Sequence, residues 1–158
     1  MNGINTITPM NILLYALLAA CAGACLAFQA GANNRLRSVL DAPGIWASYC
    51  SILGTILFSS IVMLILRPSP PSWATIKTVD WWMWIGGPLG VLVVLAGTFL
   101  VQHLGAALFI AFIVAGQLLS SLLIDHFGLM GLPETSLSWN KAGGALLVVI
   151  GVAVMKLA

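Results

Sequence analysis

Five long apolar stretches constrain this chain more than any other feature of its sequence. A helix that crosses the hydrocarbon core of a bilayer needs about 20 largely apolar residues. Five windows meet that requirement: Met10–Ala30, Ile45–Leu66, Trp81–Gln102, Ala106–Ile124 and Ala142–Ala158. Lipid offers no hydrogen-bond partner to a backbone, so only helices and closed barrels can span it. We therefore predict an all-α membrane protein with five transmembrane helices in one transmembrane domain, residues 1–158.

The composition agrees with this class and excludes several others. Hydrophobic residues make up 61% of the 158 positions and charged residues 6%, whereas charged residues are about 25% of soluble domains. The six basic residues are scattered, so we expect the lipid bilayer as a partner and no nucleic acid. The sequence has no Walker loop, no His and Cys cluster and no nucleophile beside a base. We expect no enzyme activity, no metal site and no cofactor.

The three cysteines, Cys21, Cys25 and Cys50, lie inside apolar segments. An odd number in such positions argues against a disulfide framework, and we interpret them as small packing residues. Residues 18–21 look like a lipoprotein processing site. No Lys or Arg precedes Arg35, however, so the basic segment that such a signal needs is missing. We expect the first helix to be retained as a membrane span.

A polar stripe interrupts the apolar surface of the fourth predicted helix. Gln117, Ser121 and Asp125 are four residues apart and share one helical face. Such a stripe is costly in lipid unless it faces protein or a water-filled cavity. We predict that Gln117 and Ser121 bind substrate, and that Asp125 and His126 serve coupling or gating. Two structural alternatives stay open: Gln117 as an amide clamp between helices, and residues 125–128 as a helix-end turn.

The end of the first helix carries a second polar face. Gln29, Asn33 and Arg37 share it if the helix continues, although Gly31 offers a place to bend. Gln29 and Asn33 are short enough to turn towards a cavity, so we predict that they also bind substrate. We assign Arg35 to coupling or gating. In the alternative interpretation, Arg35 and Arg37 only cap the helix and reach the lipid headgroups.

Several other polar residues have a structural interpretation. The Ser and Thr hydroxyls of the second helix can bond back to their own helix or pack against a neighbour. Ser138 is positioned to cap the last helix. Trp73 and the tryptophans of residues 81–84 are typical of an interfacial aromatic belt, with contact to substrate as the alternative.

Glycines recur on two of the predicted helices. Gly86 and Gly90 are four residues apart in the third helix, with Pro88 kinking that helix or lying in its first turns. Gly144 and Gly151 are two turns apart in the last helix. Small residues at these spacings favour close contact between helices, within one bundle or in a dimer.

The distribution of basic residues does not select an orientation. With the N-terminus on one side, that side carries Arg67, Lys77 and Lys141, and the other side carries Arg35, Arg37 and Lys156. Basic residues normally mark the cytoplasmic side. An even balance predicts insertion in both orientations, and hence an antiparallel homodimer of ten helices. Inverted repeats of this kind are a common transporter plan, with the binding site near the midplane.

Three motifs resemble a known family. They are Gln29 with Asn33 near the end of the first helix, residues 84–90 at the start of the third, and residues 116–128. Together they resemble the YdcZ-like family of bacterial inner-membrane proteins in the drug/metabolite transporter superfamily. The resemblance covers essentially the whole chain. It implies a half-transporter of five helices in the inner membrane that pairs with a copy of itself or with a homologous subunit, but it implies no substrate.

The chain departs from better-understood relatives of similar plan in one respect. Small multidrug exporters place a proton-binding glutamate inside their first helix, whereas no Asp or Glu lies within a predicted helix interior here. Proton coupling through a central carboxylate is therefore unsupported. We expect a transporter of a small polar organic solute. The alternatives are a dual-topology ion channel and a non-transporting membrane subunit that needs a partner.

Overall fold

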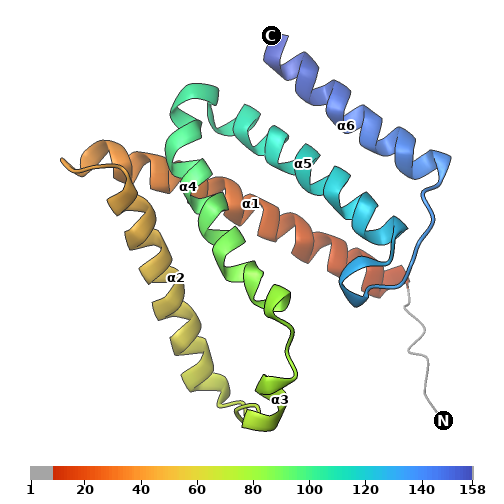
Figure 1. The fold of residues 1–158 in the computed structure, drawn as a ribbon. Coiled ribbons are helices and arrows are strands. Elements are labelled where there is room, and N and C mark those ends of the chain that lie inside the picture. Colours follow the sequence, from red (N-terminus) through yellow and green to blue (C-terminus); the bar gives the residue numbers. More distant parts are fainter. Residues whose placement is uncertain (1–8, 158) are drawn as a thin grey trace, which may run out of the picture. The chain divides into compact units, whose positions relative to one another are not determined.

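The computed structural model describes residues 9–157, and all the regular structure in that range is helical. In chain order the elements in Figure 1 are α1 (Pro9–Val39), α2 (Ile45–Leu66), α3 (Trp73–Lys77), η1 (Trp81–Ile85), α4 (Gly86–Leu104), α5 (Ala106–His126), η2 (Leu129–Gly131) and α6 (Trp139–Leu157).

Five segments are long and apolar enough to cross a membrane, as predicted. They are Asn11–Val39, Ile45–Leu66, Trp81–Leu104, Ala106–His126 and Trp139–Leu157. The first is longer than predicted, because neither Gly31 nor the asparagines after it interrupt the helix before Val39. The last begins at Trp139 rather than Ala142, and the predicted final residue, Ala158, lies outside the described residues.

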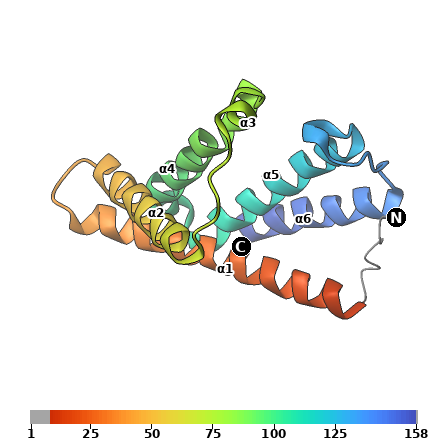
Figure 2. The same cartoon turned by 90° about the horizontal axis from the view of Figure 1, so that it is seen from below.

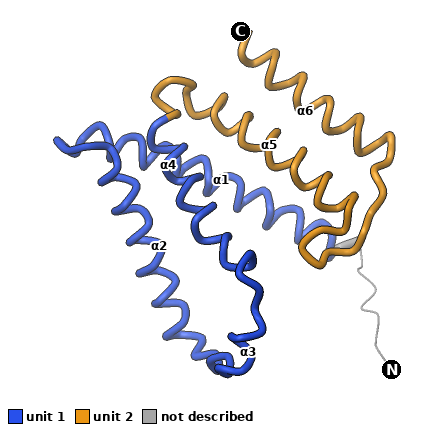
Figure 3. The backbone as a smooth tube through the Cα atoms, in the orientation of Figure 1, with its two compact units in different colours: residues 1–99 blue, residues 100–158 orange. Residues whose placement is uncertain are grey.

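The chain divides into two compact units, with the boundary between Phe99 and Leu100 (Figure 3). The first unit contains α1, α2, α3, η1 and α4 as far as Phe99. The second contains the last residues of α4 with α5, η2 and α6. The single transmembrane domain stays a prediction.

In the first unit, α1 and α2 contact each other as a hairpin, and Figure 2 shows the turn through residues 40–44 between them. Gly44, the residue before α2, has an ordinary helical φ of −56°, so space rather than backbone conformation requires glycine there. A Cβ at this position would lie 2.8 Å from Cγ and Cδ of Arg37 and 2.9 Å from Cε1 of Phe99. The missing side chain thus lets the stem of Arg37 lie against the start of α2.

One turn further along α2, a buried hydrogen bond joins α2 to α4. Ser48 Oγ donates to Thr98 Oγ1 at 2.8 Å, and Thr98 Oγ1 donates to the Val94 carbonyl at 2.9 Å. Both residues are at most 1% exposed. Small side chains with satisfied hydroxyls allow helices to approach closely. Ser48 therefore packs against a neighbour, which is one of the two predicted roles of the α2 hydroxyls.

The other predicted role, bonding within α2, is seen further along the helix. Thr55 Oγ1 donates to the Ser51 carbonyl at 3.1 Å, and Ser59 and Ser60 both donate to the Ile56 carbonyl at 2.9 and 2.8 Å. These hydroxyls lie on exposed residues of an apolar helix. Because each uses a carbonyl of its own helix, none needs a partner from another element.

The connection between α2 and α4 contains the short helices α3 and η1, and hydrogen bonds define the end of α2 and the start of α3. Arg67 adopts the left-handed conformation at φ 44°, and its N–H bonds to the Met63 carbonyl at 2.9 Å, which ends α2. Ser72 then caps α3 by accepting from Thr75 N at 3.1 Å, and Lys77 Nζ lies 5.9 Å from the ring centre of Trp73. Trp73 is 69% exposed, and the aromatic belt stays a prediction.

In the second unit, α5 and α6 contact each other. Gly105, between α4 and α5, has a φ of 75°, which favours glycine because other residues are strained there. At the start of α6, Ser138 Oγ accepts from Lys141 N at 3.3 Å. The predicted cap is therefore confirmed, and it satisfies one of the backbone donors left open at a helix start.

The glycine faces of α4 and α6 are uncovered within the described part of the chain. A Cβ at Gly86, Gly90, Gly144 or Gly151 would meet no atom within 4 Å. Pro88 lies in the first turn of α4, where a missing N–H costs no hydrogen bond. The predicted close contact at these glycines is thus not made inside either unit, and it stays a prediction for contacts beyond them.

The close approach at Gly44 predicts an unequal response of two glycines of the same hairpin. We expect Gly44→Ala to destabilise the protein by about 1–3 kcal/mol, because the new methyl group overlaps Arg37 and Phe99. Gly54→Ala, in open space on α2, should be neutral or slightly stabilising. Thermal unfolding in detergent measures both. Equal effects would contradict the packing described here.

The Ser48 hydrogen bond predicts a second contrast. Ser48→Ala should lower stability by about 1 kcal/mol, because it removes a buried hydrogen bond and leaves Thr98 with one partner fewer. Ser59→Ala is the matched control, since its hydroxyl bonds only within α2 and is exposed. A chemical or thermal unfolding series would show the difference. If Ser59→Ala lowers stability as much as Ser48→Ala, the hydrogen bond between α2 and α4 does not explain the loss.

Candidate functional site

The predicted site residues fall on both units. Gln29, Asn33 and Arg35 belong to α1 in the first unit, and Gln117, Ser121, Asp125 and His126 belong to α5 in the second. The roles proposed for these residues stay predictions.

Asn33 is the most buried polar residue of the α1 group, with 6% of its surface exposed. Its amide nitrogen Nδ2 has no hydrogen-bond partner among the described residues. Leaving a buried donor unsatisfied costs about 1–3 kcal/mol, so such a group in a folded protein requires an explanation. Gln29, one turn earlier, is partly buried. The face predicted from the spacing of these residues thus does turn inward at Asn33.

Two neighbours of Asn33 were not among the predicted site residues. Asn34 Oδ1 is also buried, with no hydrogen-bond donor near it in the described chain. Arg37, partly buried, has its stem against Gly44. Arg37 lies four residues after Asn33 and three after Asn34, so it neighbours each of them on the helix surface, whereas the two asparagines do not face each other. The spacing of Asn33 and Arg37 was visible in the sequence, but the contact of Arg37 with Gly44 was not.

Arg35 lies apart from this group. It is exposed, and its Nη1 donates to Ser38 Oγ at 3.4 Å, while Ser38 Oγ donates to the Arg35 carbonyl at 2.7 Å. These contacts stay within the last turn of α1. They agree with the interpretation of Arg35 as a helix-end residue, and they bring it to no other predicted site residue.

On α5, Gln117 and Ser121 are both exposed, so α6 does not cover them. Ser121 Oγ donates to the Leu118 carbonyl of its own helix at 2.9 Å, and this hydroxyl is therefore satisfied. The Gln117 amide makes no hydrogen bond within residues 9–157. Since Gln117 lies near the middle of the α5 span, its amide needs a polar partner from outside the α5–α6 pair.

Asp125 and His126 accept hydrogen bonds from the backbone of the loop that follows α5. The Asp125 carbonyl accepts from Thr135 N at 2.7 Å, and His126 Nδ1 accepts from Leu137 N at 3.3 Å. The His126 ring also meets the edge of Phe127, with 4.8 Å between ring centres. These contacts support the interpretation of residues 125–128 as a helix-end turn.

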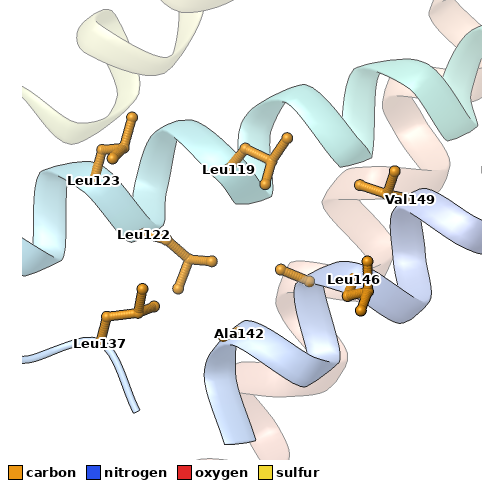
Figure 4. A pocket seen from close by; sticks show the side chains of 8 residues that line it. Leu119, Leu122, Leu123, Leu137, Ala142, Leu146 and Val149 are labelled. Atoms are coloured by element: carbon orange, nitrogen blue, oxygen red, sulfur yellow. The ribbon is translucent and has the colours of Figure 1, made fainter. Parts of the chain in front are cut away.

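The second unit also contains an apolar cavity of about 390 Å³ between α5 and α6 (Figure 4). Its walls are Leu119, Leu122, Leu123, Leu137, Ala142, Ala145, Leu146 and Val149. None of these side chains offers a hydrogen bond, so the cavity cannot orient a polar solute.

Comparison with known proteins identifies the family. The family model described as "Putative inner membrane exporter, YdcZ" matches residues 14–154. A curated relative, the inner membrane protein YdcZ of Escherichia coli (strain K12), is 36% identical over 101 residues, which are 64% of this chain and 66% of that protein. No solved structure matches the chain.

The family match extends from α1 to α6 and so includes three of the apolar spans completely and most of the first and the last. The relative is itself named for the inner membrane. The chain belongs to the YdcZ family of the drug/metabolite transporter superfamily and is a multi-pass inner-membrane protein.

Proposed function

We propose that this chain transports a small polar organic solute across the bacterial inner membrane as a dual-topology homodimer. The binding site lies at the subunit interface near the midplane of the bilayer. Gln117 carries this proposal, because it places an uncovered amide near the middle of an apolar span. The description of the family as exporters supports transport, and outward transport in particular.

The cost of an amide in lipid is the physical basis of the argument. An amide moved from water into an apolar medium without a hydrogen bond loses several kcal/mol. Neither α6 nor a residue of α5 satisfies Gln117. A water-filled cavity that admits a polar solute removes that cost, and so does a polar group of a second copy. Both conditions are met where two copies enclose a site.

The number of spans and the distribution of charges support the inverted arrangement. Five spans put the two ends of the chain on opposite sides of the membrane, and three basic residues fall on each side. A copy inserted in the opposite direction would complete ten helices with an axis in the membrane plane. The open glycine faces of α4 and α6 would allow the backbones of two copies to approach closely.

Sidedness tests the dual topology directly. In a chain whose three cysteines are replaced, single cysteines at Ser69, Ser136 or Asp41 would be labelled with an impermeant thiol reagent in intact and in permeabilised cells. All three positions are exposed. We expect about half of each site to be labelled from outside, because the even charge balance gives no preferred orientation.

Ser69 and Ser136 lie on one side of the membrane in this topology and Asp41 on the other. Complete labelling of Asp41→Cys from outside, with no labelling of the other two sites, or the reverse, would exclude an inverted copy. The chain would then require an oppositely inserted homologue.

A second test concerns Gln117. In proteoliposomes loaded with labelled amino acids, sugars and organic acids, we expect Gln117→Ala to reduce solute-specific exchange at least tenfold, since the cavity loses a hydrogen-bonding group. Gln102→Ala is the matched control, because Gln102 is an exposed amide at the end of α4. Cross-linking would follow the dimer in parallel. Loss of the dimer in Gln117→Ala would identify the amide as a clamp between subunits instead of a binding group.

A further inference from the structure

We infer that α5 pairs with the α5 helix of a second, inverted copy, so that Gln117 and the partner's Gln117 face each other across one solute site. The partner thereby contributes a residue without which the site is incomplete. This inference rests on the proposed function as an antiparallel homodimer, and it names the face through which the two copies meet. Neither the charge balance nor the number of spans identifies that face.

A seam of regularly spaced residues runs along the face of α5 that carries Gln117. Its members alternate at spacings of three and four residues: Ile110, Ile113, Gln117, Ser120 and Ile124. This spacing is the one with which two helices pack side by side. Leu119 and Leu122, which line the cavity beside α6 (Figure 4), lie roughly 150° away from Gln117 at 3.6 residues per turn. The seam therefore faces away from α6.

The two polar members of the seam lack partners. Gln117 and Ser120 are exposed, and neither side chain makes a hydrogen bond within residues 9–157. Ser121, just outside the seam, differs, because its hydroxyl donates to the Leu118 carbonyl at 2.9 Å. Unsatisfied polar groups are costly in an apolar medium. A glutamine amide both donates and accepts hydrogen bonds, so a second glutamine amide is a matching partner.

The depth of Gln117 in the span suits contact with its own copy. The α5 helix runs from Ala106 to His126, and Gln117 directly follows the central residue, Gly116. A two-fold axis in the membrane plane inverts the depth of every residue, so only residues near the middle of a span can face themselves. Ile110 and Ile124 lie seven residues before and after Gln117. Inversion therefore places each of them opposite the other.

The seam selects one register for this antiparallel pair. With the two Gln117 amides opposite each other, isoleucine packs on isoleucine at both ends. A slip of one heptad would place each amide against an isoleucine and leave both amides unsatisfied. One polar residue in an apolar seam fixes the register in this way. Beside the seam, a Cβ at Gly116 would meet no atom within 4 Å, and this open space allows two backbones to approach closely.

The paired helices would form a polar site that neither copy has alone. Two Gln117 amides and two Ser120 hydroxyls lie within about one helical turn of the axis, between the isoleucines. Hydrogen bonds between membrane helices contribute little to their association, which depends mainly on packing. The isoleucines can therefore hold the two copies together while the amides exchange each other for a solute.

Cysteine cross-linking tests the pairing and its direction. In membranes with the cysteine-free full chain, a short bifunctional thiol reagent should join Ile110→Cys in one tagged chain to Ile124→Cys in another. Neither variant should cross-link with itself, because an antiparallel pair separates identical positions by 14 residues, or about 21 Å of helix. Both variants keep Gln117. Gln117→Cys should cross-link with itself, and Leu119→Cys, exposed on the opposite face, is the matched control that should not.

A mixed dimer tests whether the two amides share one site. A wild-type chain and a Gln117→Ala chain with different tags would be co-expressed, and the mixed dimer would be isolated through both tags. We expect solute exchange per mixed dimer to be lower than in the wild-type dimer by about fivefold or more, because one site has lost one of two hydrogen-bonding groups. A loss of only half would show that each chain has a site of its own.

Other outcomes also overturn the inference. Self-cross-linking of Ile110→Cys and Ile124→Cys without the mixed product would show a parallel pair. Equal cross-linking of Leu119→Cys and Gln117→Cys would remove the preference for the seam. No cross-link at any seam position would assign the partner of Gln117 to its own chain, and failure to recover the mixed dimer would make the amides a clamp.

The two proposals can fail separately. If the predicted cross-links form but the wild-type dimer exchanges no solute in proteoliposomes, the transport proposal fails and the paired face of α5 stands. Solute exchange without the cross-link between Ile110→Cys and Ile124→Cys overturns the pairing and leaves transport standing.

Discussion

A bilayer interior supplies no water to hydrogen-bond an exposed N–H, C=O or hydroxyl, and every element of this chain reflects that constraint. Long helices satisfy their own backbones. The α2 hydroxyls at Thr55, Ser59 and Ser60 bond to carbonyls of the same helix. Where helices end, Arg67 closes α2 with a backbone bond and Ser138 caps α6. These polar groups are thus satisfied by partners within the chain.

Against that background, the unsatisfied groups carry the functional information. Ser48 and Thr98 are buried and satisfied, so they serve to hold α2 against α4. Asn33 is buried and unsatisfied, and Gln117 is uncovered near the middle of α5. The first pair stabilises the fold, whereas the two amides find no partner among the described residues of their units. A solute, water or a second copy can supply one.

Contacts within the chain also distinguish the predicted site residues from one another. Arg35 turns to Ser38 at the exposed end of α1, and His126 accepts from the Leu137 backbone. Both have ordinary structural tasks at helix ends. Arg37 lies against Gly44 and beside Asn33, although the sequence offered a headgroup anchor as an equal interpretation. The contact with Gly44 after the turn, rather than residue type, distinguishes the two arginines.

The sequence by itself determined the five spans and the family, because span length, apolarity and short motifs are local properties of consecutive residues. It also indicated the shared face of Gln29, Asn33 and Arg37, since helical spacing alone defines a face. Only the tertiary structure decided which faces are covered. Ser48 and Thr98 are 50 residues apart, and the contact of Arg37 with Gly44 requires the chain to reverse between them. Contacts of this kind depend on how helices meet, and no local pattern specifies that.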